Sequence, residues 1–363
     1  MIEINGAYGE GGGQVLRTSL TLSALTGKAA HIKNIRANRP KPGMAPQHLT
    51  NVLALAKICN ASLQGAHLRS TDLFFKPQTP PMAGDYLFDV TDVTTHGSAG
   101  SVTLILQTLL LPLAFASDQS ILILKGGTHV PWCPSYQYIA DVFLPTVSRL
   151  GLQTSSHLSA WGFYPVGNGK IKITIQGLSG HKMDTMPPQL QPLNILSRGK
   201  FKKIFGIGVA SNLPSHIAQR LAEGANAFFR SHGFTSEITP LTVTGAGPGA
   251  GLFFTAEYDH CRAGFAALGK RGKPAELVAQ EGCRDFLAYH QSAYPIDRHL
   301  ADQLLLPLAL TKGESAYQTE LITSHLITNA AIIQKFIHPK ILIKGKEGQP
   351  GTIAVQGIAP YTW

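Results

Sequence analysis

The sequence predicts an α/β protein in which one unit of helices and strands is repeated and a smaller α/β domain is inserted. Three observations lead to this prediction. Similar helical segments recur along the chain, equivalent positions in the first two copies are separated by nearly equal intervals, and a separate pattern of strands and helices interrupts the third copy. With 363 residues, of which 44% are hydrophobic and 14% charged, the chain is long enough for a large core or for two domains.

The repeated unit is defined by two consecutive helical segments and the β-like sequence after them. The first helix of each unit is expected at Gln14–Leu25, Leu104–Leu113 and Leu300–Leu310, and the last two segments share a Leu-Leu-Leu-Pro-Leu string. The second helix is expected at His48–Cys59, Tyr136–Leu150 and His325–Phe336. Gln14 lies 87 positions before Ser101, and His48 lies 88 positions before Tyr136, so a duplicated unit fits both pairs.

The most apolar stretch of the chain is Leu104–Ala116, which is predicted to be a buried helix. It contains Gln107 and Pro112 and is shorter than the roughly 20 residues that span a membrane. We therefore expect no membrane partner. Because the sequence opens on a predicted strand and turn, we also expect no signal peptide.

The insertion is predicted from a second set of strands and helices. Strands are expected at Lys200–Ala210 and Leu252–Ala256, and helices at Ser215–His232 and Pro274–Tyr289. We therefore assign residues 1–197 and 294–363 to the main domain and residues 198–293 to a small α/β domain.

Charge and cysteine usage limit the class of function. Lys and Arg number 31 against 21 Asp and Glu, a net charge of +10, which favours binding of nucleic acid or nucleotides over a merely basic surface. The four cysteines form no Cys-x-x-Cys motif, so neither a zinc ribbon nor a dithiol site is expected. Scattered cysteines are typical of reduced, intracellular proteins, and we expect a cytoplasmic location.

Two segments near the N-terminus could bind phosphate. Gly9-Glu-Gly-Gly-Gly13 precedes a helix, where backbone N–H groups and the helix N-terminus favour an anion, although it matches neither the P-loop nor the G-x-G-x-x-G pattern. The alternative is an ordinary turn. Arg36, Arg39 and Lys41 lie on a Pro/Gly-rich loop, and arginine binds phosphate through two N–H groups. The alternative there is a solvated basic loop.

Three further segments are candidates for a site. Residues 125–135 follow a strand and form either a ligand-facing loop or a plain turn, and residues 245–251 are interpreted as a flexible hairpin. His325 opens a predicted helix, whose dipole is expected to lower the pKa of its imidazole and keep it neutral and nucleophilic. Asp302, on the preceding helix, could bind a ribose hydroxyl or could simply favour the helix N-terminus.

Taken together, these segments resemble the RNA 3′-terminal phosphate cyclase family. The matching strings are GEGGGQVLR, IRANRPKPG with PQHL, GSAGS with LILQ, KGGTHVPWCP, GFYPVGNG, LGKRGKPAE, HLADQLLLPLAL and SHLITN, in family order from residue 9 to residue 329. The resemblance implies three βαβαββ units like those of the enolpyruvate transferases, with a thioredoxin-like α/β domain inserted in the third unit.

The resemblance also implies the chemistry. ATP would adenylylate a histidine, the AMP would move to an RNA 3′-phosphate, and the vicinal 2′-OH would then close a 2′,3′-cyclic phosphate and release AMP. An RNA with a 3′-phosphate end would be the partner, ATP and a divalent metal (Mg or Mn) the cofactors, and a homodimer is an open alternative to a monomer.

Residue roles carried over by position follow the same resemblance. His325 matches the nucleophile, and Glu10 matches an acidic residue near the triphosphate and the metal. Phosphates or the RNA end would be held by Gln14, Arg17, Arg36, Arg39, Gln47 and His48. The nucleoside would contact Gln107, Pro134, Asp302, Gln303 and His299, the last standing where the family often has a tyrosine.

Two other functions are compatible with parts of the pattern. A non-catalytic, cyclase-like ribosome assembly factor would bind RNA without a nucleophile, and His325 with Thr328-Asn329 argues against it. An enolpyruvyl transferase would share the architecture and the anionic substrates, but the His325 segment and PQHL argue against it.

Overall fold

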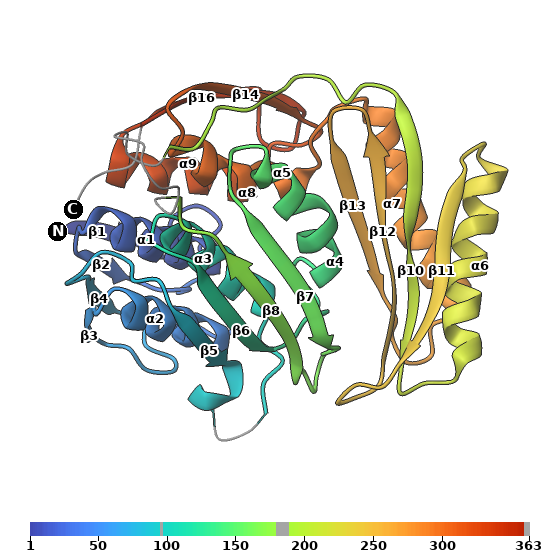
Figure 1. Ribbon diagram of the computed structural model, residues 1–363, viewed down its shortest axis with the longest axis horizontal. Helices are drawn as coiled ribbons and strands as arrows, with labels where there is room; N and C mark the ends of the chain where they lie inside the picture. Colours follow the sequence, from blue (N-terminus) through green and yellow to red (C-terminus); the bar gives the residue numbers. More distant parts are fainter. Residues whose placement is uncertain (95–96, 179–188, 359–363) are drawn as a thin grey trace.

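The computed structural model describes residues 1–94, 97–178 and 189–358, and they fold into three units with the same order of elements, strand-helix-strand-helix-strand-strand (Figure 1). The first unit contains β1 (Ile2–Asn5), α1 (Gly13–Thr26), β2 (Ala30–Lys33), α2 (Pro46–Ile58), β3 (Ser62–Gln64) and β4 (Leu73–Lys76). The second contains β5 (Asp85–Asp89), a 3₁₀ turn (Val90–Val93), α3 (Val102–Ala114), β6 (Ser120–Gly126), the helix α4 to α5 (Tyr136–Ser148), β7 (Thr154–Ala160) and β8 (Gly169–Ile175). The third contains β9 (Asn194–Ile195), α8 (Arg298–Ala309), β14 (Gly313–Thr319), α9 (Ser324–Ile337), β15 (Lys340–Lys344) and β16 (Gly351–Gly357).

The three sheets share one topology. Their strand orders are β1-β2-β4-β3, β5-β6-β8-β7 and β9-β14-β16-β15, and in each the first two strands are parallel and the others antiparallel. The predicted α/β fold of repeated βαβαββ units is confirmed by this topology. In β8 the alternation Ile171, Ile173, Ile175 places three fully buried side chains on one face, as expected for a sheet covered on one side.

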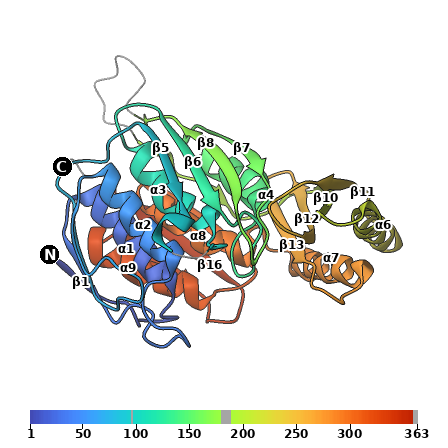
Figure 2. The same cartoon turned by 90° about the horizontal axis from the view of Figure 1, so that it is seen from below.

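The helices of the three units lie together between the sheets (Figure 2). Helix α3 is buried at each of its positions except Gln107. The prediction that the most apolar stretch of the chain forms a buried helix is therefore confirmed. A helix that is apolar on all sides needs protein on all sides, and α3 packs against α1 and α2. Among the described residues, no helix combines the length and the hydropathy needed to cross a bilayer.

The segment between β9 and α8 forms a separate four-stranded sheet at one end of the molecule (Figure 1). It contains β10 (Phe201–Ser211), α6 (Ser215–Ser231), β11 (Ser236–Val243), β12 (Gly249–Tyr258), β13 (Arg262–Leu268) and α7 (Ala275–Ser292). The sheet order is β11-β10-β12-β13, with β10 and β11 parallel and the other pairs antiparallel. The exact domain limits at residues 197 and 294 stay a prediction.

The glycine-rich segment 245–251 is not a hairpin, contrary to the sequence interpretation. Strand β11 pairs with β10 and not with β12, so this segment crosses the end of β10. A Cβ atom on Gly249 would lie 2.1 Å from the Phe163 ring, and one on Gly247 would lie 2.7 Å from Val166. The glycines therefore allow the loop 161–168 of the second unit to pack closely against the inserted sheet.

Candidate active site

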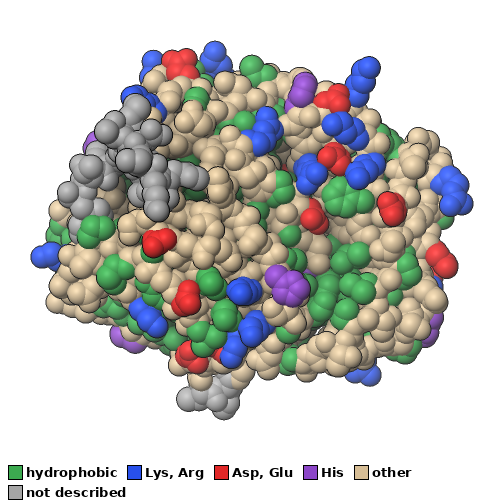
Figure 3. All heavy atoms as spheres, viewed as in Figure 1, with side chains coloured by type: hydrophobic (Ala, Val, Ile, Leu, Met, Phe, Trp, Pro, Cys, Tyr) green, Lys and Arg blue, Asp and Glu red, His purple; other side chains and the backbone are tan. Residues whose placement is uncertain are grey.

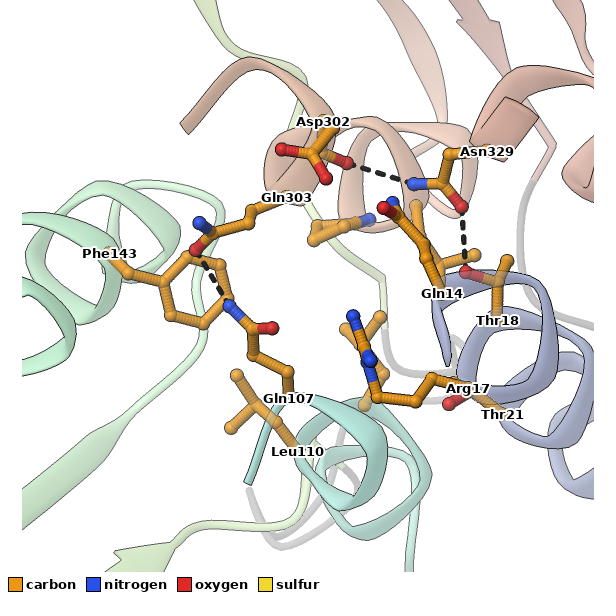
Figure 4. Close-up of a pocket in the computed structure, with 13 residues that line it drawn as sticks. Gln14, Arg17, Thr18, Thr21, Gln107, Leu110, Phe143, Asp302, Gln303 and Asn329 are labelled. Atoms are coloured by element: carbon orange, nitrogen blue, oxygen red, sulfur yellow. Dashed lines mark hydrogen bonds between the residues drawn. The ribbon is translucent and has the colours of Figure 1, made fainter. Parts of the chain in front are cut away.

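Helices from all three units surround one pocket, and the side chains drawn in Figure 4 point into it from α1, α3 and α8. Five residues predicted from the sequence line it: Gln14, Arg17, Gln107, Asp302 and Gln303. Eight other lining residues had no predicted role: Thr18, Thr21, Leu110, Leu111, Phe143, Leu306, Pro307 and Asn329. The pocket combines polar side chains of α1, α3 and α8 with apolar side chains of α3 and α8, as expected for a small-molecule site.

Side-chain hydrogen bonds connect the helices that surround the pocket. Gln107 Nε2 donates to Gln303 Oε1 at 2.8 Å, which joins α3 to α8. Thr18 Oγ1 donates to Asn329 Oδ1 at 2.7 Å, and Asn329 Nδ2 donates to the Asp302 carbonyl oxygen at 2.9 Å. Asn329 thus connects α1, α8 and α9, one turn after His325 (Figure 4).

The glycines of the loop before α1 leave room for the side chain of Glu10 in the same loop and of Thr328 in α9. Gly9 and Gly11 have φ angles of +59° and +58°, which favour glycine. Cβ atoms would lie 2.1 Å from Thr328 Oγ1 at Gly9 and 2.2 Å from Glu10 Oε1 at Gly12. Helix α1 starts at Gly13 without a side-chain cap, so its first backbone N–H groups are available to an anion.

Glu10, Arg39 and His325 form a charged cluster at this loop. Arg39 Nη2 donates to Glu10 Oε2 and, at 3.0 Å, to the Glu10 carbonyl oxygen. Glu10 Oε1 lies 3.3 Å from His325 Nδ1, but the contact is not a well-aligned hydrogen bond and this buried oxygen has no other partner. Glu10 has 7% of its side chain exposed and His325 has 50%, so the carboxylate is enclosed while the imidazole remains accessible.

The pKa of His325 is raised, which is opposite to the direction expected from its place at a helix N-terminus. Pairing with Glu10 raises the pKa and outweighs desolvation by burial, which lowers it. For Glu10, burial raises the pKa, but His325, Arg39 and Arg17 together lower it below its usual value. A carboxylate at contact distance has a larger effect than the helix dipole.

Asp302 and Arg17 both line the pocket, and each influences the pKa of the other. Burial raises the pKa of the Asp302 carboxyl, and the nearby His325 and the Gln14 side chain oppose this shift. Burial lowers the pKa of Arg17, while Asp302 and Glu10 raise it. An arginine remains charged after such a shift, so the pocket keeps a fixed positive charge.

His48 is placed under the glycine loop by the start of α2. The backbone N–H of Ala45 donates to His48 Nδ1 at 3.1 Å, and a Cβ atom on Gly13 would lie 2.3 Å from His48 Nε2. Burial lowers the pKa of His48 to about 3, with contributions from Arg36 and Arg17. The imidazole is therefore neutral, with its Nε2–H directed at the start of α1.

Four further residues predicted from the sequence do not line the pocket and contact other parts of the protein: Arg36, Gln47, Pro134 and His299. Arg36 Nη1 donates to the Gly43 carbonyl oxygen at 2.7 Å, and Gln47 Oε1 accepts from the Ser101 backbone N–H at 2.9 Å. The Pro134 carbonyl oxygen accepts from Thr103 Oγ1 at 2.8 Å, which ties residues 127–135 to the start of α3. His299 opens α8 and meets the Tyr138 ring edge-on at 6.5 Å.

Several residues that shape the site had little signal in the sequence. Buried Asp297 caps α8 through the N–H groups of His299 and Leu300, and Tyr138 donates to it at 2.8 Å. Phe143 reaches the pocket from a π-helical stretch, Ile139–Phe143, which no local pattern predicts. Asn329 was present in the SHLITN string, and its spacing of four from His325 was the available signal.

A second cavity lies at the junction of α5 (Leu144–Ser148) with the inserted domain and has a different character. On the face in Figure 3, Lys and Arg side chains are interspersed with Asp and Glu side chains. Of the cations lining this cavity, Lys202 lies 3.5 Å from Asp259 and Arg262 lies 3.0 Å from Glu257. These pairs neutralise much of the charge, so the pocket at α1, α3 and α8 is the stronger candidate for an anionic substrate.

The family is established by comparison with known proteins. A family model described as RNA 3′-terminal phosphate cyclase matches residues 8–343. The chain belongs to the RNA 3′-terminal phosphate cyclase family. A cyclase of this name from Gloeothece citriformis (strain PCC 7424) is 50% identical over 336 residues, covering 93% of both chains. Cyclases from Methylococcus capsulatus (strain ATCC 33009 / NCIMB 11132 / Bath) and Pyrococcus abyssi (strain GE5 / Orsay) are 45% and 38% identical, each over 98% of this chain and covering 97% and 98% of the relative.

Among solved structures, the cyclase chain has a distant likeness to the enolpyruvyl transferase NikO from Streptomyces tendae. The TM-score is 0.40 and the identity 10%, over 99% of this chain and 48% of that one.

Proposed function

We propose that the protein converts the 3′-phosphate end of an RNA into a 2′,3′-cyclic phosphate and consumes ATP as its co-substrate. The observation that carries the proposal is the accessible imidazole of His325, held by Glu10 Oε1 at 3.3 Å beside the glycine loop and the Arg17 pocket. This arrangement combines a nucleophile, a group that orients it and fixed positive charge, which is what phosphoryl chemistry requires.

The first proposed step is adenylylation of His325. Because Nδ1 faces Glu10, Nε2 carries the lone pair that attacks the α-phosphorus of ATP. The bond from phosphorus to nitrogen forms as the bond to the pyrophosphate oxygen breaks, and pyrophosphate leaves. Glu10 Oε1 faces Nδ1 at 3.3 Å, and its negative charge would stabilise the cationic imidazole of the product, as the carboxylate does in other carboxylate–histidine pairs.

Two transfers to and within the RNA follow. An oxygen of the RNA 3′-phosphate attacks the phosphorus of the histidine adduct, the phosphorus–nitrogen bond breaks, and an RNA-pp-A end forms. The vicinal 2′-OH then attacks the terminal RNA phosphorus, loses its proton and expels AMP. The hydroxyl is already next to the phosphorus, so ring closure gains from proximity, and a DNA end lacks the group.

Glu10 is the residue that fits a divalent metal. Its Oε1 is a buried carboxylate oxygen without a well-aligned partner, and hard oxygen donors suit Mg²⁺ or Mn²⁺. The described residues contain no group of three or more acidic, histidine or cysteine side chains for a metal, so one carboxylate, substrate phosphates and water would hold the ion. When bound, the metal would neutralise the charge that develops on the phosphates.

The remaining roles follow from position. We propose that Arg17, Arg36, Arg39 and Gln14 hold phosphates at the start of α1, and of these Gln14 and Arg17 line the pocket. Neutral His48 would donate through Nε2, with Gln47 fixing the adjacent Ser101. The nucleoside would lie against Gln107, Asp302 and Gln303, with Pro134 and His299 at its edges. A cytoplasmic location and a homodimer remain predictions from the sequence.

The two alternative functions, a ribosome assembly factor and an enolpyruvyl transferase, are less well supported. An assembly factor would need no accessible histidine paired with a buried carboxylate. An enolpyruvyl transferase is disfavoured by the family membership.

Three RNA ends test the proposal. An oligoribonucleotide with a 3′-phosphate should become cyclic while ATP is cleaved to AMP and pyrophosphate, and one with a 3′-OH should be inert. An oligonucleotide with a terminal 2′-deoxy sugar and a 3′-phosphate should stop at the pp-A end. Cyclisation of the deoxy end, or equal reaction of the 3′-OH end, would refute the proposed function.

A further inference from the structure

Trp132 is the most exposed large hydrophobic side chain in the described part of the chain, with an exposed fraction of 100%. A tryptophan carries a large apolar surface that water solvates poorly, so full exposure is costly unless a ligand covers the ring. Its φ angle of +66° lies in the left-handed region, which bulky residues seldom adopt. Such strain concentrates at functional sites, so both features point to a binding role.

The loop that carries Trp132 is fixed to the scaffold on both sides. Before it, Gly127 forms a bridge with Ser101, and Thr128 Oγ1 accepts from the Gly162 backbone N–H at 2.9 Å. After it, the Pro134 carbonyl oxygen accepts from Thr103 Oγ1. The indole is therefore presented on an ordered support, which lowers the entropy lost when a ligand binds.

The same loop touches the candidate active site. Cys133, the next residue, is close enough to Arg17 for each to influence the other's ionisation, and its thiol interacts with Ser101. Adjacent Cα atoms are about 3.8 Å apart, so the Trp132 backbone lies directly beside a residue whose thiol is influenced by the charge of Arg17. Trp132 does not line the pocket, but the loop that carries it is joined to Ser101 and Thr103 at the start of α3, the helix that contributes Gln107 to the pocket.

We propose that Trp132 is a stacking platform for a nucleobase of the RNA strand near its 3′ end, an inference that rests on the proposed function. Every base has a flat π-face, so an aromatic side chain holds an RNA end without selecting its sequence. The exposed cation Lys41 and the net charge of +10 supply complementary charge for the strand. Stacking on Trp132 would bring the terminal phosphate towards Arg17 and His325.

The test compares Trp132→Ala and Trp132→Phe with Leu342→Ala, an exposed apolar residue on β15 that serves as the matched control. Binding is measured by fluorescence anisotropy with a short labelled oligoribonucleotide ending in a 3′-phosphate. The alanine variant should bind about five- to a hundredfold more weakly and show a similarly raised KM for RNA, while phenylalanine should restore most of the affinity. The control should bind like the parent protein.

A second set of measurements separates this inference from its rivals. Trp132→Gly also relieves the backbone strain, so it should lose RNA affinity like alanine while its Tm stays equal or rises. The KM for ATP in adduct formation without RNA should change less than twofold. An unchanged RNA affinity in Trp132→Ala, or a loss confined to ATP, would overturn the inference. If the parent protein formed no adduct and no cyclic end, the proposed function itself would fail instead.

Discussion

Gly13 begins α1, and a methyl group added to it would occupy space that His48 and Arg17 now fill. The Cβ atom would lie 2.3 Å from His48 Nε2 and 3.0 Å from Arg17 Nη1, whereas ordinary contact begins near 3.4 Å. The His48 ring must therefore move by about 1 Å, a displacement that can cost roughly 10²-fold in rate at a catalytic site. Alanine is the better helix former by up to about 1 kcal/mol, but displacing the buried His48 ring costs about 1–3 kcal/mol, so Gly13→Ala should lower the free energy of unfolding by no more than about 3 kcal/mol.

The assay combines kcat/KM for a 3′-phosphate RNA with thermal unfolding. If Gly13→Ala acts through His48, the double variant with His48→Ala should be no less active than His48→Ala alone, because the displaced group is already absent. Gly224→Ala in α6, where the nearest neighbour of the new Cβ is 3.5 Å away, is the matched control and should keep full activity. Full activity of Gly13→Ala, or effects that add in the double variant, would refute the reasoning.

Two further predictions concern the contact of Glu10 with His325 and the hydrogen bond between Thr18 and Asn329. Glu10→Gln removes the charge that raises the pKa of His325, so an NMR titration of the unliganded protein should show the His325 midpoint at lower pH, and an unchanged midpoint would contradict the pairing. Thr18→Val leaves Asn329 Oδ1 without its donor, which should lower the free energy of unfolding by about 1–3 kcal/mol, measured by denaturant titration. Thr239→Val on the exposed side of β11 should stay within about 0.5 kcal/mol of the parent, and equal effects of the two changes would count against the Asn329 contact.

The repeat could be predicted from sequence because its helices carry strong local signals. The Leu-Leu-Leu-Pro-Leu strings lie in α3 and α8, which have the same place in their units. Gln107 and Asp302 both precede the proline of these helices by five residues, and both line the pocket. A polar residue at the same place in two apolar helices is therefore a signal for a shared site.

Other features could not be predicted, because they depend on contacts distant in the chain. Strand β9 has two residues, too few for any periodicity, so the first strand of the third unit is recognisable from its pairing with β14 alone. The contact of Glu10 with His325 joins the two ends of the chain, and it reverses the direction of the His325 pKa expected from the helix dipole. A local sequence pattern can identify His325 as a candidate, but it does not show which distant charged residue changes its pKa.

The most direct test of the account is covalent labelling. The protein is incubated with α-labelled ATP and Mg²⁺ or Mn²⁺ and separated by denaturing electrophoresis. We expect a labelled adduct that is acid-labile and stable to alkali, that is absent in His325→Ala and that is retained in His157→Ala, a change to an exposed histidine on β7. Full labelling of His325→Ala, or conversion of RNA ends by the parent protein without any adduct, would contradict it.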